Sequence, residues 1–102
     1  MALSSCTIPA AGKPTFDIGV DEIEFGVGIH GEPGRKREKI KMANHIVEDM
    51  VSAILKDFDE KSLDPRDPNG IILLVNGFSG THLSELYLIY QAVTEKLKEK
   101  QI

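Results

Sequence analysis

The sequence predicts a small layered α/β domain, a mixed sheet with flanking helices, and three observations carry this prediction. Residues 22–30 alternate between apolar and other side chains, as in a strand with one buried face. Residues 44–58 and 81–97 repeat apolar side chains at helical spacing, and a short unbroken apolar run lies between them at 71–75. The order strand, helix, strand, helix is typical of an α/β layer arrangement.

The first strand is predicted from the stretch EIEFGVGIH, residues 22–30. Successive side chains of a strand point to opposite faces, so this stretch has an apolar face and a second face. The apolar face is Ile23, Phe25, Val27 and Ile29, and the second face is Glu22, Glu24, Gly26, Gly28 and His30. The turn-forming sequence Gly31-Glu32-Pro33-Gly34 then ends the strand.

A helix is expected next, with Asn44 as its N-cap because a side-chain oxygen there can accept a bond from the first-turn amides. One apolar stripe runs along it, formed by Ile46, Val47, Met50, Val51, Ile54, Leu55 and Phe58. Residues 59–70, DEKSLDPRDPNG, contain two prolines and a glycine among polar residues, and they predict a polar loop.

The run IILLV, residues 71–75, predicts a strand buried on both faces because it has no polar alternation. A Gly-rich loop follows at 76–80, and Thr81 is expected to cap a final helix. The predicted inward stripe of that helix is Leu83, Leu86, Tyr87, Tyr90, Val93 and Leu97. Lysines near its end, Lys96, Lys98 and Lys100, suit the negative pole of the helix dipole.

The sequence predicts two strands, or three if residues 3–8 form another. A sheet of so few strands is too small to bury a run as apolar as residues 71–75. A strand buried on both faces needs neighbours on both sides. The 102-residue chain is therefore expected to be one domain, residues 1–102, that is part of something larger or completes itself against a partner.

Composition narrows the class of protein. The chain is 41% hydrophobic and 27% charged, as in ordinary globular proteins, and its net charge of −4 offers no basic field for nucleic acid or an anionic membrane. For the basic cluster Arg35-Lys36-Arg37, a solvated turn is favoured over a phosphate-binding patch. Cys6 is the sole cysteine, which favours a reducing cytosol and an incidental thiol. We expect no membrane span and no signal peptide.

The spacing Gly26-x-Gly28-x-x-Gly31 matches the dinucleotide-binding fingerprint, but its context does not. That fingerprint needs glycines that follow a strand and open a helix, with an acidic residue ending a second strand about 20 positions later. Here the predicted strand includes Gly26 and Gly28, and a charged turn follows. Glycines on one strand face instead mark a place where another group approaches the backbone closely.

His30 shares the predicted glycine face, and a neutral imidazole can serve as nucleophile, base, acid or ligand. From spacing alone, structural and functional interpretations of His30 are equally open. His45 and His82 are expected to be surface residues at helix starts, and the three histidines lack metal-ligand spacing, so no metal site is expected. The loop 76–81 has the geometry of an anion site at a helix N-terminus but no P-loop lysine, so chain reversal alone is favoured.

Two blocks carry a resemblance to a known family. They are ALSSCTIPAAGKPTF (2–16) with DEIEFGVGIHGEPG (21–34), and LVNGFSGTHLSELY (74–87). The chain resembles the substrate-binding K subunit, or K domain, of dihydroxyacetone (glycerone) kinases, cytoplasmic enzymes of glycerol metabolism. The match in order runs over most of the chain, and it implies an α/β fold that is part of the second domain of a K subunit.

The resemblance implies roles for particular residues. In the family, the histidine of the Gly-Ile-His-Gly-Glu-Pro-Gly motif, here His30, adds to the C2 carbonyl of dihydroxyacetone to form a hemiaminal. Gly26, Gly28 and Gly31 would shape the pocket, and Glu32 with Pro33 would fix the turn. No cofactor is expected on this chain. The phosphoryl donor, ATP-Mg or a phosphotransferase-system relay, would be held by a partner L subunit or L domain.

Family K subunits are longer than this chain, and residues that act on the reacting hydroxyl lie upstream. The resemblance therefore implies a K-subunit fragment that is inactive alone and that forms a homodimer or associates with the rest of a K subunit. The alternative is a non-catalytic K-like paralogue or remnant that acts as a ketone sensor, regulator or interaction protein.

Overall fold

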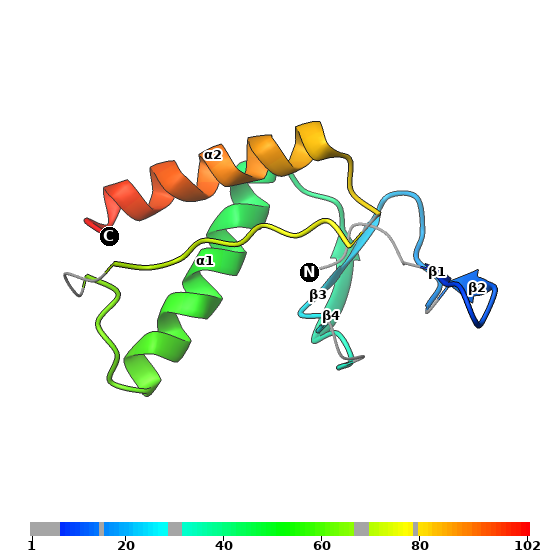
Figure 1. Ribbon diagram of the computed structural model, residues 1–102, viewed down its shortest axis with the longest axis horizontal. Coiled ribbons are helices and arrows are strands. Elements are labelled where there is room, and N and C mark those ends of the chain that lie inside the picture. The colour runs from blue at the N-terminus through cyan, green and yellow to red at the C-terminus, as the bar shows by residue number, and fades with distance from the viewer. Residues whose placement is uncertain (1–6, 15, 29–31, 67–69, 79) are drawn as a thin grey trace. The chain divides into compact units, whose positions relative to one another are not determined.

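The computed structural model of the chain describes residues 7–14, 16–28, 32–66, 70–78 and 80–102 (Figure 1). The elements are β1 (Thr7–Ile8), β2 (Lys13–Pro14), β3 (Glu22–Phe25), β4 (Lys36–Lys39), α1 (Ala43–Glu60) and α2 (Leu83–Glu99). They fall into two compact units, one of residues 1–41 with 77–82 and one of residues 42–76 with 83–102. The combination of helices and strands confirms the predicted α/β class.

The strands of the first unit form two antiparallel ladders. β1 pairs with β2, with Thr7 opposite Pro14, so part of the third strand expected at 3–8 is present and the rest lies outside the described residues. β3 pairs with β4, with Ile23 opposite Glu38. Within the described ranges both pairs are antiparallel, so a parallel component of a mixed sheet would require a further strand.

The β3–β4 hairpin corrects two expectations. The strand predicted at 22–30 ends at Phe25, because Gly26 adopts a positive φ of 87° that leaves the strand conformation. Lys36 and Arg37, predicted to lie in a turn, instead belong to β4. Acidic β3 residues face basic β4 residues across the ladder, Glu22 opposite Lys39 and Glu24 opposite Arg37, and such cross-strand pairs of opposite charge stabilise a hairpin.

The first helix, α1, begins one residue before the predicted cap. Met42 occupies the N-cap position without a side-chain hydrogen bond, so Asn44 as N-cap was wrong. At the other end the helix runs to Glu60, and the amide of Lys61 donates to the carbonyl of Asp57. The polar loop predicted at 59–70 therefore begins at residue 61, two residues later than predicted. Its residues 67–69 lie outside the described residues.

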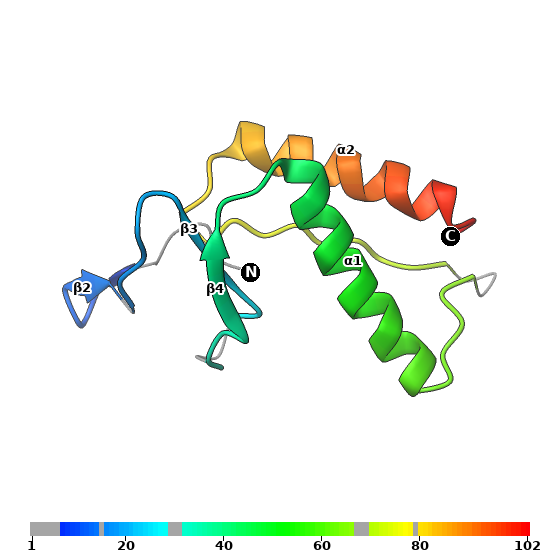
Figure 2. The same ribbon diagram turned by 180° about the vertical axis from the view of Figure 1, so that it is seen from behind.

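The core of the second unit lies between α1 and α2. Val47, Val51 and Val93 are buried there, and half-buried side chains pack against them: Leu55, Leu73, Ile89, Ala92 and Leu97. The α1 stripe is confirmed except at Ile54, which is exposed. Figures 1 and 2 show that the extended chain leading to residue 76 passes across α1.

The second helix, α2, differs from the prediction in its first residue and in the face that packs against the core. It begins at Leu83 rather than directly after Thr81. Three members of the predicted inward stripe, Leu83, Tyr87 and Tyr90, are exposed, because the face that meets the core is the one carrying Ile89 and Val93. The expected basic end is confirmed by Lys96 and Lys98 in the last turn.

An ion pair joins the two helices. The ammonium nitrogen of Lys96 lies 2.5 Å from a carboxylate oxygen of Glu48. The hydrogen bond from Lys96 lowers the pKa of the Glu48 carboxyl and raises the pKa of Lys96 in turn. Because both side chains are partly exposed to solvent, this ion pair contributes little to stability.

The strand predicted at 71–75 is not formed. Residues 71–75 are extended but join neither of the ladders among the described residues, so the prediction of a strand buried on both faces was wrong for this chain. Ile72 is 99% exposed and Leu74 is 81% exposed, whereas Leu73 packs on the valine core. Within the ranges that the structure describes, the segment is extended like a strand but pairs with no other strand.

Candidate functional site

The predicted site residues lie in the connection between β3 and β4. Gly26, Gly28 and Glu32 belong to the described residues of this connection, and His30 and Gly31 lie outside them. The connection leads from one strand into another and not into a helix, which excludes the dinucleotide-binding arrangement for a different reason than predicted. A hairpin connection places the motif at one end of a two-stranded ladder.

Gly26 is the residue at which the chain leaves β3. Its φ of 87° lies in the left-handed region that favours glycine. A β-carbon at this position would lie 2.8 Å from Cγ and 3.2 Å from the backbone nitrogen of Arg35. The amide of Arg35 donates to the carbonyl of Phe25 at 2.7 Å, which closes the ladder beside Gly26. Gly26 therefore permits the hairpin to close, and the expected strand face shared by Gly26 and Gly28 does not form.

Gly28 and Glu32 close the base of a smaller loop. The amide of Gly28 donates to the carbonyl of Glu32 at 3.2 Å, and residues 29–31 lie between them in sequence. A β-carbon on Gly28 would overlap the carboxylate of Glu32 and lie 2.9 Å from its Cβ, so the backbones meet only because Gly28 has no side chain. Two of the predicted site residues are thus brought together by a direct bond.

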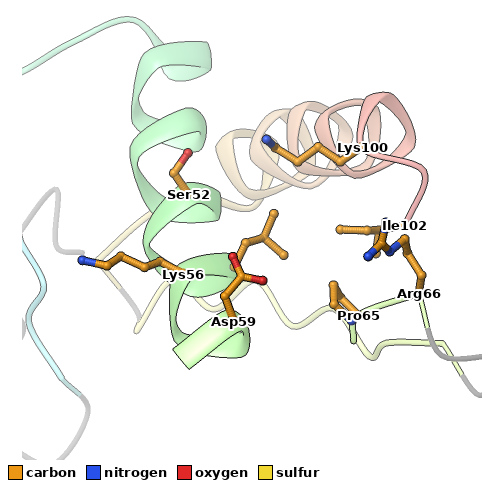
Figure 3. Close-up of a pocket in the computed structure, with 8 residues that line it drawn as sticks. Ser52, Lys56, Asp59, Pro65, Arg66, Lys100 and Ile102 are labelled. Carbon is orange, nitrogen blue, oxygen red and sulfur yellow. The ribbon is translucent and has the colours of Figure 1, made fainter. Parts of the chain in front are cut away.

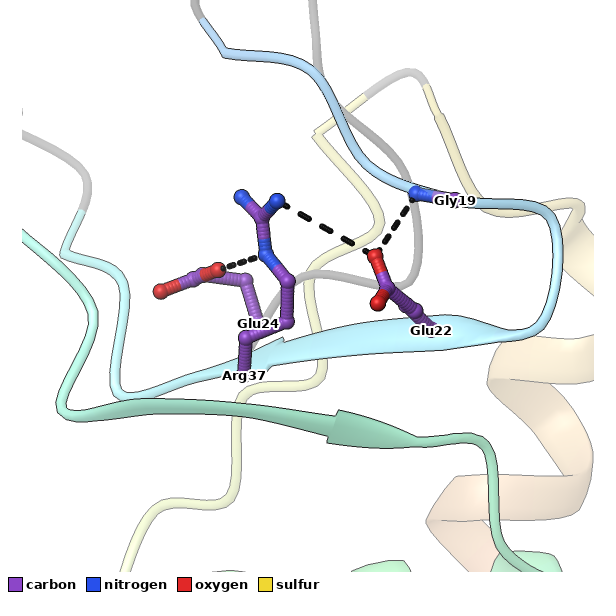
Figure 4. Close-up of polar contacts among 4 residues, drawn as sticks. All are labelled: Gly19, Glu22, Glu24 and Arg37. Atoms are coloured by element: carbon purple, nitrogen blue, oxygen red, sulfur yellow. Dashed lines mark hydrogen bonds and ion pairs between the residues drawn. The ribbon is translucent and has the colours of Figure 1, made fainter.

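An ionic network supports the hairpin next to this loop (Figure 4). Nε of Arg37 donates to the Glu24 carboxylate at 2.8 Å, and a second guanidinium nitrogen lies 3.9 Å from Glu22. Glu22 also accepts a hydrogen bond from the amide of Gly19 at 3.0 Å. The hydrogen bond to Glu24 raises the pKa of Arg37. Glu22 and Glu24 thus both contact Arg37 across the ladder.

Other charges of the hairpin are also paired. Glu38 accepts hydrogen bonds from Lys41 and Lys36, which lower the pKa of its carboxyl. The ammonium of Lys36 also lies 5.4 Å from the centre of the Phe25 ring, within range of a cation–π contact. Two cations of the basic cluster, Lys36 and Arg37, are therefore paired with carboxylates of the hairpin.

Two amides of the Gly-rich loop at 76–81 form hydrogen bonds within the loop. The amides of Gly80 and Thr81 both donate to the carbonyl of Gly77, at 2.9 and 3.1 Å, and Phe78 has a positive φ of 47°. Because these two amides are bonded within the loop, they do not point at an external anion.

A separate cavity of about 340 Å³ lies in the helical unit (Figure 3). Its lining is Ser52, Leu55, Lys56, Asp59, Pro65, Arg66, Lys100 and Ile102. Arg66 is bound to Asp64 at 2.9 Å and Lys56 lies 3.6 Å from Glu60, while Figure 3 shows Lys56 extending away from Arg66. The basic groups do not converge on a common point, and no predicted site residue lines this cavity.

Two classes of site are absent from the described residues. Among the residues that the structure describes, no group of three or more histidine, cysteine and carboxylate side chains is arranged to hold a metal ion. Neither α1 nor α2, the helices in the described part of the chain, is both long and apolar enough to cross a membrane. His45 and His82 are exposed, as predicted.

Comparison with known proteins gives consistent matches over the whole chain. The family model of the Dak1 domain matches residues 1–102. The PTS-dependent dihydroxyacetone kinase 1, dihydroxyacetone-binding subunit DhaK, of Listeria innocua is 43% identical over 98 residues. The PEP-dependent dihydroxyacetone kinase, dihydroxyacetone-binding subunit DhaK, of Escherichia coli K12 is 35% identical over 118 residues, and the Triokinase/FMN cyclase of Homo sapiens is 32% identical over 102.

These relatives are much longer than the chain. The match covers 96% of the chain but 28% of the Listeria protein, 97% but 33% of the E. coli protein, and 100% but 18% of the human protein. No solved structure matches the chain. Because the family model spans every residue, the chain belongs to the Dak1 domain family.

Proposed function

We propose that this chain supplies the covalent ketone-binding segment of a dihydroxyacetone kinase, with His30 as the residue that bonds to the substrate. The neutral imidazole of His30 adds to the C2 carbonyl carbon of dihydroxyacetone. A carbon–nitrogen bond forms as the carbonyl π bond breaks, the carbonyl oxygen takes up a proton, and the imidazole loses one. The product is a tetrahedral hemiaminal. Glycerol has no carbonyl, so it is not bound in this way.

The closure of the loop by Gly28 and Glu32 is the observation that supports this proposal most directly. Their backbone hydrogen bond holds together the two ends of the segment that contains His30. A β-carbon at Gly26 would collide with Arg35 and one at Gly28 with Glu32, so glycine at these positions lets the chain segments that flank His30 in sequence approach each other. The names of the Listeria and E. coli relatives, which describe dihydroxyacetone-binding subunits, support the same substrate.

The covalent bond would serve mainly to position the substrate. A ketone fixed at C2 presents a terminal hydroxyl in one place, and phosphoryl transfer depends largely on such positioning. The phosphoryl donor is held by a partner L subunit or domain. The Listeria and E. coli relatives are named as PTS-dependent and PEP-dependent, which favours a phosphotransferase relay over ATP-Mg as the donor. On this proposal the chain alone does not phosphorylate dihydroxyacetone.

The adduct can be detected by NMR with dihydroxyacetone labelled with ¹³C at C2 and protein labelled with ¹⁵N in histidine. We expect a new tetrahedral carbon resonance that is coupled to a histidine nitrogen, which free hydrated ketone cannot give. The signal should disappear in His30→Ala and persist in His45→Ala and His82→Ala, two matched changes of exposed histidines. Far-UV circular dichroism confirms that each variant keeps its helices.

Two results would reject the proposal: a folded chain without the coupled resonance, or a coupling that survives His30→Ala. Addition of an L subunit and its phosphoryl donor then separates a kinase segment from a ketone sensor. A kinase segment, assembled with Dak1 polypeptide of the kind that the relatives carry outside the matched region, yields dihydroxyacetone phosphate. A sensor forms the adduct and yields none.

A further inference from the structure

The carboxylate of Glu24 lies against the backbone of Gly34, on the part of the connection that returns to β4. A β-carbon on Gly34 would overlap this carboxylate and would lie 2.7 Å from Cγ of Glu24. The side chain of Glu24 is 16% exposed, so its carboxylate is largely enclosed where it meets the glycine. Glu24 therefore links β3 directly to a residue that follows the candidate loop.

Arg37 of β4 holds the Glu24 carboxylate in this place. Oε2 of Glu24 accepts the hydrogen bond from Nε of Arg37 at 2.8 Å (Figure 4), while Oε1 is the atom closest to the position of a Gly34 β-carbon. The two oxygens of one carboxylate thus contact two different residues. Because a hydrogen bond between charged groups is strong and directional, it restricts the orientation of the Glu24 side chain.

A stiff stretch of backbone connects Gly34 to the base of the loop. The ring of Pro33 fixes its φ, and the residue before a proline, here Glu32, is restricted to extended conformations. The carbonyl of Glu32 accepts the hydrogen bond from the amide of Gly28 that closes the loop. A displacement of Gly34 is therefore expected to disturb the bond between Gly28 and Glu32.

We propose that Glu24 is a positioning residue for ketone binding. Together with Arg37, it holds the returning part of the connection and so keeps closed the loop that contains His30. This inference rests on the proposed function of His30, and it adds a residue that acts through the backbone of residues 32–34.

Glu22 provides a matched control on the same strand. Its carboxylate lies 3.9 Å from the same guanidinium group, but it accepts a hydrogen bond from the amide of Gly19, before β3. A β-carbon on Gly19 would lie 2.9 Å from this carboxylate. Glu22 and Glu24 therefore share charge, strand and cationic partner, and they differ in the glycine that each contacts.

Two measurements separate the role of Glu24 from the chemistry of His30. One is hydrogen exchange at the Gly28 amide, which needs no ketone. The other is the dissociation constant for dihydroxyacetone, obtained from the intensity of the ¹³C–¹⁵N coupled adduct signal as ketone is added. For Glu24→Gln we expect faster exchange at Gly28 and binding weaker by about tenfold, the usual effect of losing a hydrogen bond to a charged group.

The adduct signal itself distinguishes positioning from loss of chemistry. At saturating ketone, Glu24→Gln should give the same coupled resonance as the unaltered chain, because His30 is intact. Exchange at the ladder amides of residues 22–25 and 36–39 should change less than exchange at Gly28. Glu22→Gln should change neither the exchange at Gly28 nor the binding of ketone.

Gly34→Ala tests the contact without removing a charge. The backbone of Gly34 lies outside the left-handed region, so it accepts alanine, but the new β-carbon must displace the Glu24 carboxylate. We expect the same weakening of binding as in Glu24→Gln. The double variant should be no weaker than either single variant, because each change removes the same contact.

Four outcomes would overturn the inference. They are unchanged ketone binding in Glu24→Gln, equal weakening in Glu24→Gln and Glu22→Gln, additive effects of Glu24→Gln and Gly34→Ala, and exchange that speeds up equally at Gly28 and at the ladder amides. If the unaltered chain forms no adduct, the proposed function of His30 fails and this inference fails with it. An adduct that forms in the unaltered chain and is equally stable in Glu24→Gln rejects this inference alone.

Discussion

The β3–β4 hairpin and the α1–α2 pair are held together by different forces. In the hairpin, Ile23 is the one large side chain of the described ladder residues that is fully buried, and Arg37 of β4 pairs with Glu22 and Glu24 of β3 across the backbone ladder. In the helical unit, three buried valines of α1 and α2 and five half-buried side chains, one of which is Leu73 of the extended segment, form a continuous apolar core. Exposed ion pairs contribute little and are screened by salt, whereas apolar burial is not. The hairpin that carries the candidate site is thus the weaker region.

The largest effect should come from the core of the helix pair. Val47 is 2% exposed, and Val47→Ala removes buried methyl groups and leaves a cavity, so we expect a loss of about 2 kcal/mol in the free energy of unfolding. Urea denaturation followed by far-UV circular dichroism measures it. Ile54→Ala, an exposed position on the same helix, is the control and should cost far less. If Val47→Ala reduces amide protection in the hairpin as much as in the helix pair, the two regions unfold together.

A smaller effect is expected at the hairpin connection. Gly26→Ala forces a β-carbon into the left-handed region, which costs about 1–2 kcal/mol, and brings that carbon against Arg35. Gly12→Ala is the matched control because Gly12 has a similar φ of 63° with nothing within 4 Å. Hydrogen exchange at 22–25 and 36–39 should speed up in Gly26→Ala and stay unchanged in Gly12→Ala. Unchanged exchange in Gly26→Ala would contradict the role assigned to this glycine.

The smallest effect should be that of salt on the hairpin. Raising the ionic strength from about 0.05 M to about 1 M shortens the screening length to about 3 Å, so exchange at 36–39 should speed up. Arg37→Gln removes the bond to Glu24 and should reduce this salt dependence. Arg66→Gln breaks a comparable exposed pair with Asp64 and should not alter it. If the salt dependence is the same in Arg37→Gln, ion pairs do not hold the hairpin.

Helices were predicted more closely than strands, and the reason is physical. A helix satisfies its own backbone, so the apolar repeat at Val47 and Val51 was enough to place α1. A strand needs a partner, and IILLV alone does not provide one. β4 was missed because Lys36–Lys39 contains no apolar residue. The signal that could have revealed it is charge complementarity, since EIEF and KREK lie on either side of a turn-forming sequence.

The candidate site was predicted in composition but not in geometry. Alternation placed Gly26 and Gly28 on one strand face, yet a glycine can leave the strand conformation at little cost, and Gly26 does so. Gly28 and Glu32 are joined by a backbone hydrogen bond, and the pattern of side chains in the sequence does not predict such a bond. His30 and Gly31 lie outside the described residues, so their assigned roles stay predictions that rest on the family resemblance.

The distribution of charge on the extended segments has a consequence for handling this protein in solution. β3 carries two glutamates, and β4 carries three basic residues among its four, so two like strands from different molecules would place like charges opposite each other. Residues 71–75 carry no charge and no proline, the composition of segments that stack into cross-β fibrils. Concentrated solutions of the isolated chain should therefore aggregate through IILLV, and Ile72→Lys should keep the chain in solution.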